Sequence, residues 1–268
     1  MTRPCTRLDL SFCGRRTGAM RVRRIEFSTK VLIAGLLIAV AAATSSAVCA
    51  ATRPVVVELF TSQGCSSCPK ADAYLRELAT RENVIALSFN VDYWDYLGWK
   101  DTLASPAFTR RQRAYAHRLG LSGVYTPQIV VNGVAEDVGS HRDEIEAAIA
   151  GQASGDAGVG MAFVEEDGSL MLNVESGDAP EKPATLWLVR YAAEEAVNIR
   201  RGENRSRTIT YAHAVRELTP VGMWDGNALS LKLPKSDLLT KGLEGCVALL
   251  QAGEGGPILG AARIDLLQ

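Results

Sequence analysis

The feature that most constrains this fold is a close pair of cysteines, Cys65 and Cys68, set between two patterned segments. Residues 55–60 form a short run of β-branched and apolar side chains, which predicts a buried strand. Residues 71–79 carry apolar side chains at helical spacing with the charged residues off that stripe, which predicts an amphipathic helix. Because Pro69 fits the first turn of a helix and not its interior, we expect the cysteine pair at the start of this helix.

This placement gives the two thiols different chemical roles. Free backbone N–H groups and the helix dipole stabilise an anion at a helix N-terminus, which lowers the pKa of a cysteine there and favours its nucleophilic thiolate. We therefore predict that Cys65 attacks a substrate disulfide and that Cys68 resolves the mixed disulfide by intramolecular attack. A permanent structural disulfide between them would constrain little of the unfolded chain, because the loop it closes is very short.

Strand and helix signals alternate through the first half of the chain. The expected strands after the cysteine pair are residues 84–91, 129–131 and 134–138, the last two joined by an Asn-Gly hairpin signal. Helices are expected from Ser105-Pro106, an N-cap and first-turn pair, and again after residue 140. This order predicts an α/β domain over residues 51–151.

The second half follows a different pattern. A Gly/Ser/Asp-rich stretch over residues 151–160 has the composition of a linker. Beyond it, apolar and polar residues alternate with a period of two, and turn signals separate the short runs. The candidate strands are residues 170–174, 184–191, 197–200, 207–211, 229–233, 245–251 and 257–265. We therefore expect an antiparallel all-β, sandwich-like domain over residues 152–268.

Charge is unevenly distributed along the chain. Residues 1–50 carry eight basic and two acidic side chains, whereas residues 51–268 carry 21 basic and 28 acidic ones. Residues 31–43 are an uncharged run, shorter than the roughly 20 residues that a spanning helix needs. This pattern predicts a cleavable signal peptide over residues 1–50, with Met20 standing where such a signal would naturally begin. The mature protein is then periplasmic or secreted; an uncleaved membrane anchor is the alternative.

Removing that segment changes the cysteine count. Of six cysteines, Cys65, Cys68 and Cys246 would remain, and Cys246 lies in an apolar run typical of an inert buried thiol. With 47% hydrophobic side chains and nearly balanced charge, the chain is neither disordered nor a strongly basic nucleic-acid binder. Three scattered histidines and a single CxxC leave too few ligands for a closed zinc site, so neither a metal nor another cofactor is expected.

The first half resembles the thioredoxin superfamily in its strand–turn–CxxC–helix unit and in Tyr125-Thr126-Pro127, which precedes the third strand. In that superfamily a cis-proline at this place faces the cysteine pair, and its backbone pairs with the substrate. The resemblance implies that Thr126 and Pro127 form a substrate-binding cis-Pro loop. Many thioredoxins carry a Trp immediately before the first cysteine; Gly64 stands there in this chain, so a thioredoxin-like redox potential is not implied.

More narrowly, the chain resembles a family of secreted thioredoxin-like proteins of unknown function, the DUF1223 group. Four sequence words carry this resemblance: residues 58–69 (ELFTSQGCSSCP), 91–100 (VDYWDYLGWK), 125–128 (YTPQ) and 201–204 (RGEN). These words lie in both halves, so the resemblance covers most of the chain after the predicted signal. The family name implies no substrate.

Other side chains are candidates for supporting roles. Glu58 is an acid inside an apolar strand, so we consider it either a buried proton acceptor for Cys68 or a strand-end residue that reaches solvent or pairs with an arginine. Asp92, Trp94 and Trp99 lie in an aromatic-rich segment after a strand. They indicate either a groove beside the thiols or a loop that covers the core.

These observations favour an exported thiol–disulfide oxidoreductase that acts on protein thiols or disulfides and is reset by a partner redox protein. We expect no nucleic-acid partner and no membrane partner after signal cleavage. A non-enzymatic thioredoxin-fold binding or scaffold protein is one alternative, and a copper-handling protein that uses the same two thiolates is another. The direction of the redox reaction, the substrate, the role of the β-rich half and the oligomeric state are left open by the sequence.

Overall fold

The computed structural model describes residues 53–155, 158–238 and 241–266. The predicted signal peptide over residues 1–50 lies outside these residues. Within the described part of the chain, no helix combines the length and apolar character needed to cross a membrane.

The first half folds in the order that its sequence predicts. Its elements are β1 (Val55–Thr61), α2 (Pro69–Ala79), β2 (Val84–Asn90), the 3-10 turn η1 (Asp95–Leu97), α3 (Pro106–Arg118), β3 (Gln128–Val131), β4 (Ala135–Val138) and α4 (Arg142–Ala153). The predicted N-cap of α3 is confirmed, because the Ser105 side chain accepts a hydrogen bond from the Ala107 backbone N–H. The predicted hairpin turn is also confirmed: Asn132 and Gly133 both have positive φ.

The second half is rich in strands. Its elements are β5 (Met161–Glu166), β6 (Ser169–Val174), β7 (Ala184–Asn198), β8 (Thr208–Trp224), β9 (Leu229–Leu233), the short helix α5 (Lys235–Leu238), β10 (Gly245–Gln251) and β11 (Ile258–Asp265). The fold is therefore mixed α/β in its first half and β-rich in its second.

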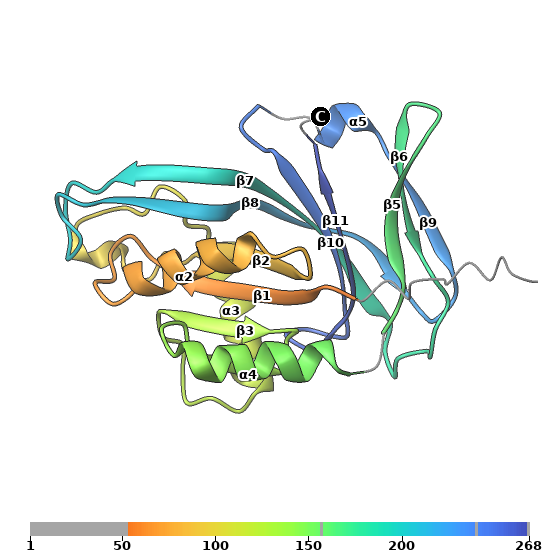
Figure 1. Cartoon of the computed structure of the whole chain (residues 1–268), viewed down its shortest axis with the longest axis horizontal. Helices are drawn as coiled ribbons and strands as arrows, with labels where there is room; N and C mark the ends of the chain where they lie inside the picture. Colours follow the sequence, from red (N-terminus) through yellow and green to blue (C-terminus); the bar gives the residue numbers. More distant parts are fainter. Residues whose placement is uncertain (1–52, 156–157, 239–240, 267–268) are drawn as a thin grey trace, which may run out of the picture. The chain divides into compact units, whose positions relative to one another are not determined.

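Eight strands from both halves form one sheet, in the order β11-β10-β7-β8-β2-β1-β3-β4 (Figure 1). β1 and β2 are parallel, β2 and β8 are parallel, and the other neighbouring pairs are antiparallel. The halves meet where Ser88 of β2 pairs with Ala214 of β8. The sheet thus continues across residue 151, and the described residues after Ala50 cluster as one compact unit. The expected domain boundary at residue 151 stays a prediction.

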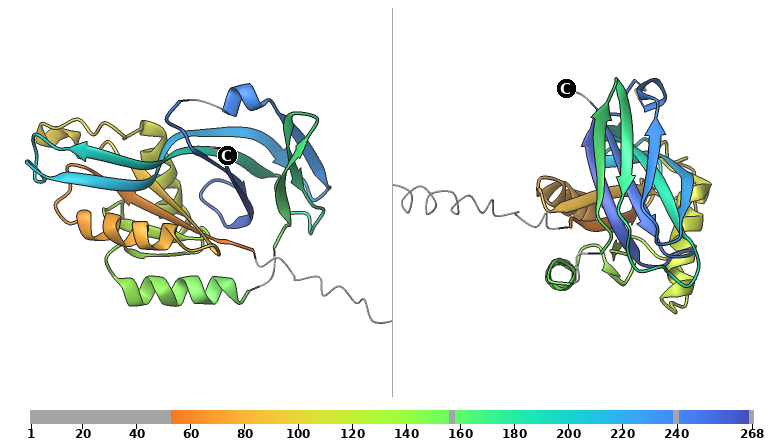
Figure 2. Two further views of the ribbon diagram at one scale, coloured as in Figure 1. Left: turned by 45° about the horizontal axis from the view of Figure 1, so that its top comes forward. Right: turned by 90° about the vertical axis from the view of Figure 1, so that its right-hand side faces the viewer.

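A second, three-stranded antiparallel sheet has the order β5-β6-β9 (Figure 2). Leu172 and Val174 on its inner face pack in one cluster with Leu186 and Leu250 of the large sheet. This face-to-face packing makes the region sandwich-like. The larger layer is the continuation of the mixed sheet, however, and not a sheet that belongs to the second half alone.

The long hairpin of β7 and β8 differs from the expected short strands. The sequence predicts separate strands over 184–191, 197–200 and 207–211, but β7 and β8 are continuous, and their pairing extends from Ala184 with Trp224 to Asn198 with Thr208. The alternation of apolar and polar residues fails near Glu194 because that part of β7 is exposed. Cross-strand hydrogen bonds with β8 keep it extended there.

The helices lie on both faces of the sheet and position the cysteines. Alternate residues of β1 point to opposite faces, so Val57 and Leu59 pack in the core beneath α2 and α4, while Val56 and Phe60 pack in the core beneath α3 (Figure 2). α2, which begins at the cysteine pair, is therefore held on one face of the sheet, and α3 is held on the other.

Candidate functional site

The cysteine turn, residues 62–68, connects the end of β1 to the start of α2. Cys68 is the N-cap residue of α2, and Pro69 occupies its first turn as predicted. The Cys68 backbone N–H donates to the Cys65 carbonyl at 3.2 Å, which brings the two residues into one tight turn. Both are free thiols. Cys65 is only 2% exposed and Cys68 is fully buried, whereas the two serines between them are exposed.

The pKa values of the two thiols differ strongly in direction. Hydrogen bonding to the Cys68 side chain, followed by bonds at Thr126 and at the backbone of the turn, lowers the pKa of Cys65 to about 6 against the opposing effect of burial. Burial raises the pKa of Cys68 far above its ordinary value, and the Cys65 hydrogen bond and the Asp72 charge act in the same direction. The arrangement therefore favours a thiolate at Cys65 and a protonated thiol at Cys68.

The Thr126–Pro127 segment lies directly against the Cys65 side chain. The Thr126–Pro127 peptide bond is cis. The Sγ atom of Cys65 lies 3.7 Å from the Thr126 carbonyl oxygen, within hydrogen-bonding range for sulfur. The Trp94 indole N–H donates to the Thr126 hydroxyl at 2.8 Å, which links the aromatic segment to the same loop.

The three candidate groove residues have different surroundings. Trp94 stacks on Tyr96, which is 77% exposed, and Trp99 donates its indole N–H to the Gln63 side chain at 2.8 Å. The two tryptophans therefore border the cysteine turn. Asp92 does not face this turn in the same way, because its carboxylate accepts a hydrogen bond from the Thr109 hydroxyl of α3 at 2.6 Å.

The close approach of Trp94 also accounts for the glycine that precedes Cys65. A Cβ atom at position 64 would lie 3.0 Å from the Trp94 Cβ and 3.4 Å from its carbonyl oxygen. A large side chain in this position would require the aromatic segment to move. Gly64 thus stands where a tryptophan from another part of the chain approaches the cysteine turn.

The geometry corrects the prediction that Glu58 accepts a proton from Cys68. Glu58 lies on the α3 face of the sheet, opposite α2, because it alternates with Val57 and Leu59 along β1. Its carboxylate accepts hydrogen bonds from Arg111 at 2.7 and 3.1 Å and from the Tyr115 hydroxyl. Glu58 is therefore the anion of a buried ion pair, which is the arginine-pairing alternative.

A buried acid on the cysteine side of the sheet is Asp72, which sequence reasoning missed. It lies four residues after Cys68 on α2, so the two side chains share one face of the helix. Asp72 is 3% exposed; its Oδ1 accepts a hydrogen bond from Thr61 at 2.7 Å, and its Oδ2 is buried without a partner among the described residues. Burial raises the pKa of Asp72 to about 8, and the Cys65 charge adds to this increase, while the Thr61 hydrogen bond opposes it. The spacing of four residues from Cys68 was the available signal.

The second half of the chain contributes a further contact. The hairpin tip, residues 199–207, joins β7 to β8 and lies beside the cysteine turn (Figure 1). Asn204 is fully buried, and its side-chain amide donates to the carbonyl oxygens of Gln63 at 3.1 Å and Cys65 at 2.7 Å. Glu203 accepts a hydrogen bond from the Ser66 backbone N–H at 2.9 Å. Two of the four family words, residues 58–69 and 201–204, thus meet in space.

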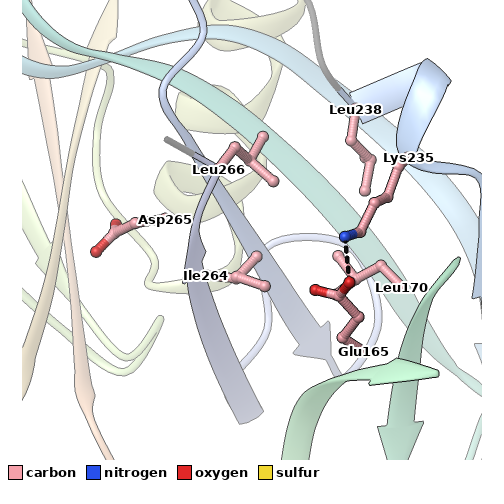
Figure 3. Close-up of a pocket in the computed structure, with 7 residues that line it drawn as sticks. All are labelled: Glu165, Leu170, Lys235, Leu238, Ile264, Asp265 and Leu266. Atoms are coloured by element: carbon pink, nitrogen blue, oxygen red, sulfur yellow. Dashed lines mark ion pairs between the residues drawn. The ribbon is translucent and has the colours of Figure 1, made fainter. Parts of the chain in front are cut away.

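A pocket elsewhere in the structure has a different character. It has a volume of about 300 Å³ and lies between β6, α5 and β11, and its lining does not include the cysteines. Leucine and isoleucine side chains form much of its wall, Lys235 and Glu165 form an ion pair at 2.5 Å, and Asp265 points away from that pair (Figure 3). Within the described ranges, no group of three or more His, Cys, Asp or Glu side chains is placed to hold a metal ion.

The fold and the site define a class of protein: a mixed α/β chain whose cysteine pair, at the start of a helix, is contacted by a hairpin from the β-rich half. The chain belongs to the DUF1223 family, a family of proteins of unknown function, whose model matches residues 56–251. This match confirms the family resemblance and extends into both halves.

Two solved structures are similar to this chain. One, a structural genomics target from Agrobacterium tumefaciens, is 35% identical, covers 80% of this chain and 95% of its own, and has a TM-score of 0.69. The other, HBP35 of Porphyromonas gingivalis, is 16% identical, covers 80% of this chain and 75% of its own, and has a TM-score of 0.53; at this identity the likeness concerns the fold alone. No curated protein matches the chain.

Proposed function

We propose that this protein is an exported thiol–disulfide oxidoreductase in which Cys65 is the nucleophile and Cys68 the resolving thiol. The observation that carries the proposal is the geometry of the pair: two free thiols share one turn at the start of α2, and the Cys65 sulfur lies against the cis Thr126–Pro127 loop. In this arrangement the pKa of Cys65 is lowered to about 6 and that of Cys68 is raised. A thiolate at neutral pH is the reactive form in disulfide exchange. A permanent structural disulfide does not require the two thiols to differ in pKa.

We assign the first half to the thioredoxin-like type as part of the same proposal. The strand order β2-β1-β3-β4, with β1 and β2 parallel and β3 antiparallel to β1, supports the assignment. So does the cis peptide at Thr126–Pro127 beside the Cys65 thiol. The remaining strands of the large sheet extend this unit beyond β2.

The reaction proceeds in two exchange steps. The Cys65 thiolate attacks one sulfur of a substrate disulfide, so that a mixed disulfide forms and the other substrate sulfur leaves as a thiolate. Cys68 then attacks the Cys65 sulfur, the mixed disulfide breaks, and the second substrate thiolate leaves. The substrate gains two electrons and becomes a dithiol, and the Cys65–Cys68 pair becomes a disulfide. A partner redox protein returns the pair to its starting state, and the reverse sequence oxidises a substrate.

Asp72 takes the proton that Cys68 must lose in the second step. The carboxylate shares a helix face with Cys68, and its Oδ2 has no hydrogen-bond partner among the described residues. The negative charge of Cys65 raises the pKa of Asp72, and that charge disappears when Cys65 enters the mixed disulfide. The Asp72 carboxylate therefore ionises more readily when Cys68 has to be deprotonated.

The proposal is tested by equilibrating the protein in a series of glutathione redox buffers and counting free thiols by alkylation and mass spectrometry. We expect a reversible two-electron couple that disappears in Cys65→Ser and Cys68→Ser, while the buried Cys246 is unaffected by the buffer. A pair that remains oxidised under strongly reducing conditions, or never forms a disulfide, would refute the proposal. Fractionation of cells that express the full chain tests its export.

One observation favours a second candidate, a non-enzymatic binding protein that uses the same fold as a scaffold. Cys65 is 2% exposed, so a substrate disulfide reaches its sulfur only after neighbouring atoms move. The redox titration separates the two candidates, because a scaffold requires no reversible couple. Retention of Cu(I) against a chelator in the same samples would instead indicate copper handling.

A further inference from the structure

The hairpin tip is fixed against the cysteine turn, so any side chain it exposes is held near Cys65. Asn204 anchors the tip through its two hydrogen bonds to the Gln63 and Cys65 carbonyl oxygens. The backbone at Gly202 also lies close, since a Cβ there would be 3.9 Å from the Gly64 Cα and 3.7 Å from the Trp99 Cβ. Ile199, at the base of the tip, is fully buried in a cluster with Leu103.

This anchored tip is strongly basic. It exposes four arginines, Arg200, Arg201, Arg205 and Arg207, and contains one acid, Glu203, which gives it a net charge of +3. The carboxylate of Glu203 already accepts the Ser66 N–H. Two lysines flank the same region: Lys70 follows the cysteine pair on α2, and Lys100 follows Trp99, and both are exposed.

The basic surface contrasts with the charge of the rest of the chain. Residues 51–268 carry 28 acidic and 21 basic side chains, a net charge of −7. Subtracting the +3 of the tip leaves −10 for the remainder. Basic side chains on a tip that contacts the cysteine turn of an otherwise acidic protein attract anionic groups toward that turn.

We infer that the hairpin tip, with Lys70 and Lys100, is a docking surface for an acidic polypeptide segment adjoining the substrate's disulfide. The inference rests on the proposed thiol–disulfide function and names the substrate class. Guanidinium groups match carboxylates in geometry as well as charge, so an arginine-rich tip suits Asp and Glu side chains. An extended substrate that passes Thr126 has its neighbouring residues within reach of the tip, because the tip and the Thr126 loop both contact Cys65.

The test compares disulfide peptides of equal length whose residues beside the cysteine are Glu, Gln or Lys. The reduced protein is mixed with each peptide, and the second-order rate of reduction is measured at about 0.01 M and about 0.15 M salt, where the Debye length falls from about 30 Å to about 8 Å. We expect the Glu peptide to react about tenfold faster than the Gln peptide at low salt, at the lower end of electrostatic steering effects. The difference should shrink at the higher salt concentration.

Matched variants assign the effect to the tip. The triple change Arg200→Ser, Arg201→Ser and Arg205→Ser removes three charges and leaves Arg207, which donates to the Asn204 side chain. The control changes three exposed arginines of α3, on the other face of the sheet: Arg110→Ser, Arg113→Ser and Arg118→Ser. We expect only the tip variant to lose the preference for the Glu peptide.

Equal loss in both variants would refute the inference in favour of a general effect of net charge, and an unchanged preference in the tip variant would refute it outright. If the Gln peptide is reduced and the Glu peptide is reduced no faster, the docking inference is wrong while the thiol function stands.

If no peptide reacts, fluorescence anisotropy of a labelled Glu peptide in which serine replaces cysteine still tests whether the peptide binds. Binding that the tip variant abolishes supports the surface, and binding that it retains, or none at all, overturns it.

Discussion

The change Asp72→Asn tests whether the pKa of the buried acid that follows the cysteine pair on α2 is raised. Burial raises the pKa of Asp72 to about 8 from the 3.8 of an unperturbed Asp. Because the pKa of Asp72 is higher in the folded state, its protonated form contributes to the free energy of unfolding. This contribution is fully present below the unfolded pKa and is lost as pH rises through the folded pKa. At 1.36 kcal/mol for each pH unit, the loss between about pH 5 and about pH 8 amounts to about 3–4 kcal/mol, as an upper bound.

An asparagine at this position keeps an oxygen for the Thr61 hydroxyl and cannot ionise. We therefore expect Asp72→Asn to be more stable than wild type in urea by about 1–2 kcal/mol already at about pH 5, which lies above the unfolded pKa. The difference should grow by about 3–4 kcal/mol at about pH 8. Both proteins are kept reduced, so that the cysteine pair is in the same state. Glu82→Gln, which removes an exposed acid just after α2, is the matched control and should change little at either pH.

The same variant has a kinetic consequence. If Asp72 accepts the Cys68 proton, the release of a mixed disulfide between Cys65 and a chromogenic thiol slows in Asp72→Asn, and its rate no longer follows the titration of a carboxyl group. A stability difference from wild type that is the same at both pH values would show that Asp72 ionises normally. An unchanged release rate with an unchanged pH profile would remove it from the mechanism.

Three further changes probe the site. Cys68→Ala removes the main hydrogen bond to the Cys65 thiolate, so the midpoint of the pH profile of Cys65 alkylation should rise from about 6 toward the ordinary thiol value; an unchanged midpoint would contradict this. Arg111→Met leaves the Glu58 carboxylate buried without its cation, and urea unfolding should show a loss of about 3–5 kcal/mol with an unaltered Cys65 profile. A loss well below that range would contradict a stabilising role for the Arg111–Glu58 ion pair. Asn204→Ala removes two hydrogen bonds to the cysteine turn and should cost about 2 kcal/mol and accelerate Cys65 alkylation; alkylation at the wild-type rate would show that the tip does not restrict the turn.

The parts of the fold that could be predicted depend on local signals. Ser105 and Pro106 mark the start of α3, and Asn132-Gly133 marks the turn between β3 and β4, because each motif stabilises its own conformation without help from distant residues. The position of the cysteine pair at the start of α2 follows in the same way from Pro69.

The parts that could not be predicted depend on distant pairing. The parallel contact of β2 with β8 joins residues 88 and 214, and nothing in either strand alone specifies that neighbour. The exposed stretch of β7 around Glu194 lacks the apolar alternation of a half-buried strand, although the backbone from Glu194 to Asn198 is paired with β8. Short-range periodicity therefore divides one long hairpin into several short strands.

The roles of the two acids illustrate the same limit at the site. Glu58 and Asp72 both lie close in sequence to the cysteine pair, and either could serve it. The deciding fact is the face of the sheet on which each side chain lies: Glu58 meets Arg111 on one face, and Asp72 meets Thr61 on the other. The sequence shows which residues of a strand share one face, because side chains alternate along it. It does not show on which face the helix that carries the cysteines packs, because that depends on the fold of the whole chain.

The anchoring of the hairpin tip explains how the β-rich half bears on the chemistry of the other half. Cys65 and Cys68 sit on a short turn in which the Cys65 carbonyl already accepts the Cys68 N–H. The Asn204 amide donates to the carbonyl oxygen of Cys65, and the Glu203 carboxylate accepts the N–H of Ser66. The conformation of the turn is therefore set partly by a hairpin more than 130 positions away in the chain. Because the same hairpin is a continuous part of the large sheet, any displacement of β7 and β8 relative to β2 changes the surroundings of the thiolate. The reactive groups thus belong to the first half, and their accessibility and charge environment are determined jointly with the second.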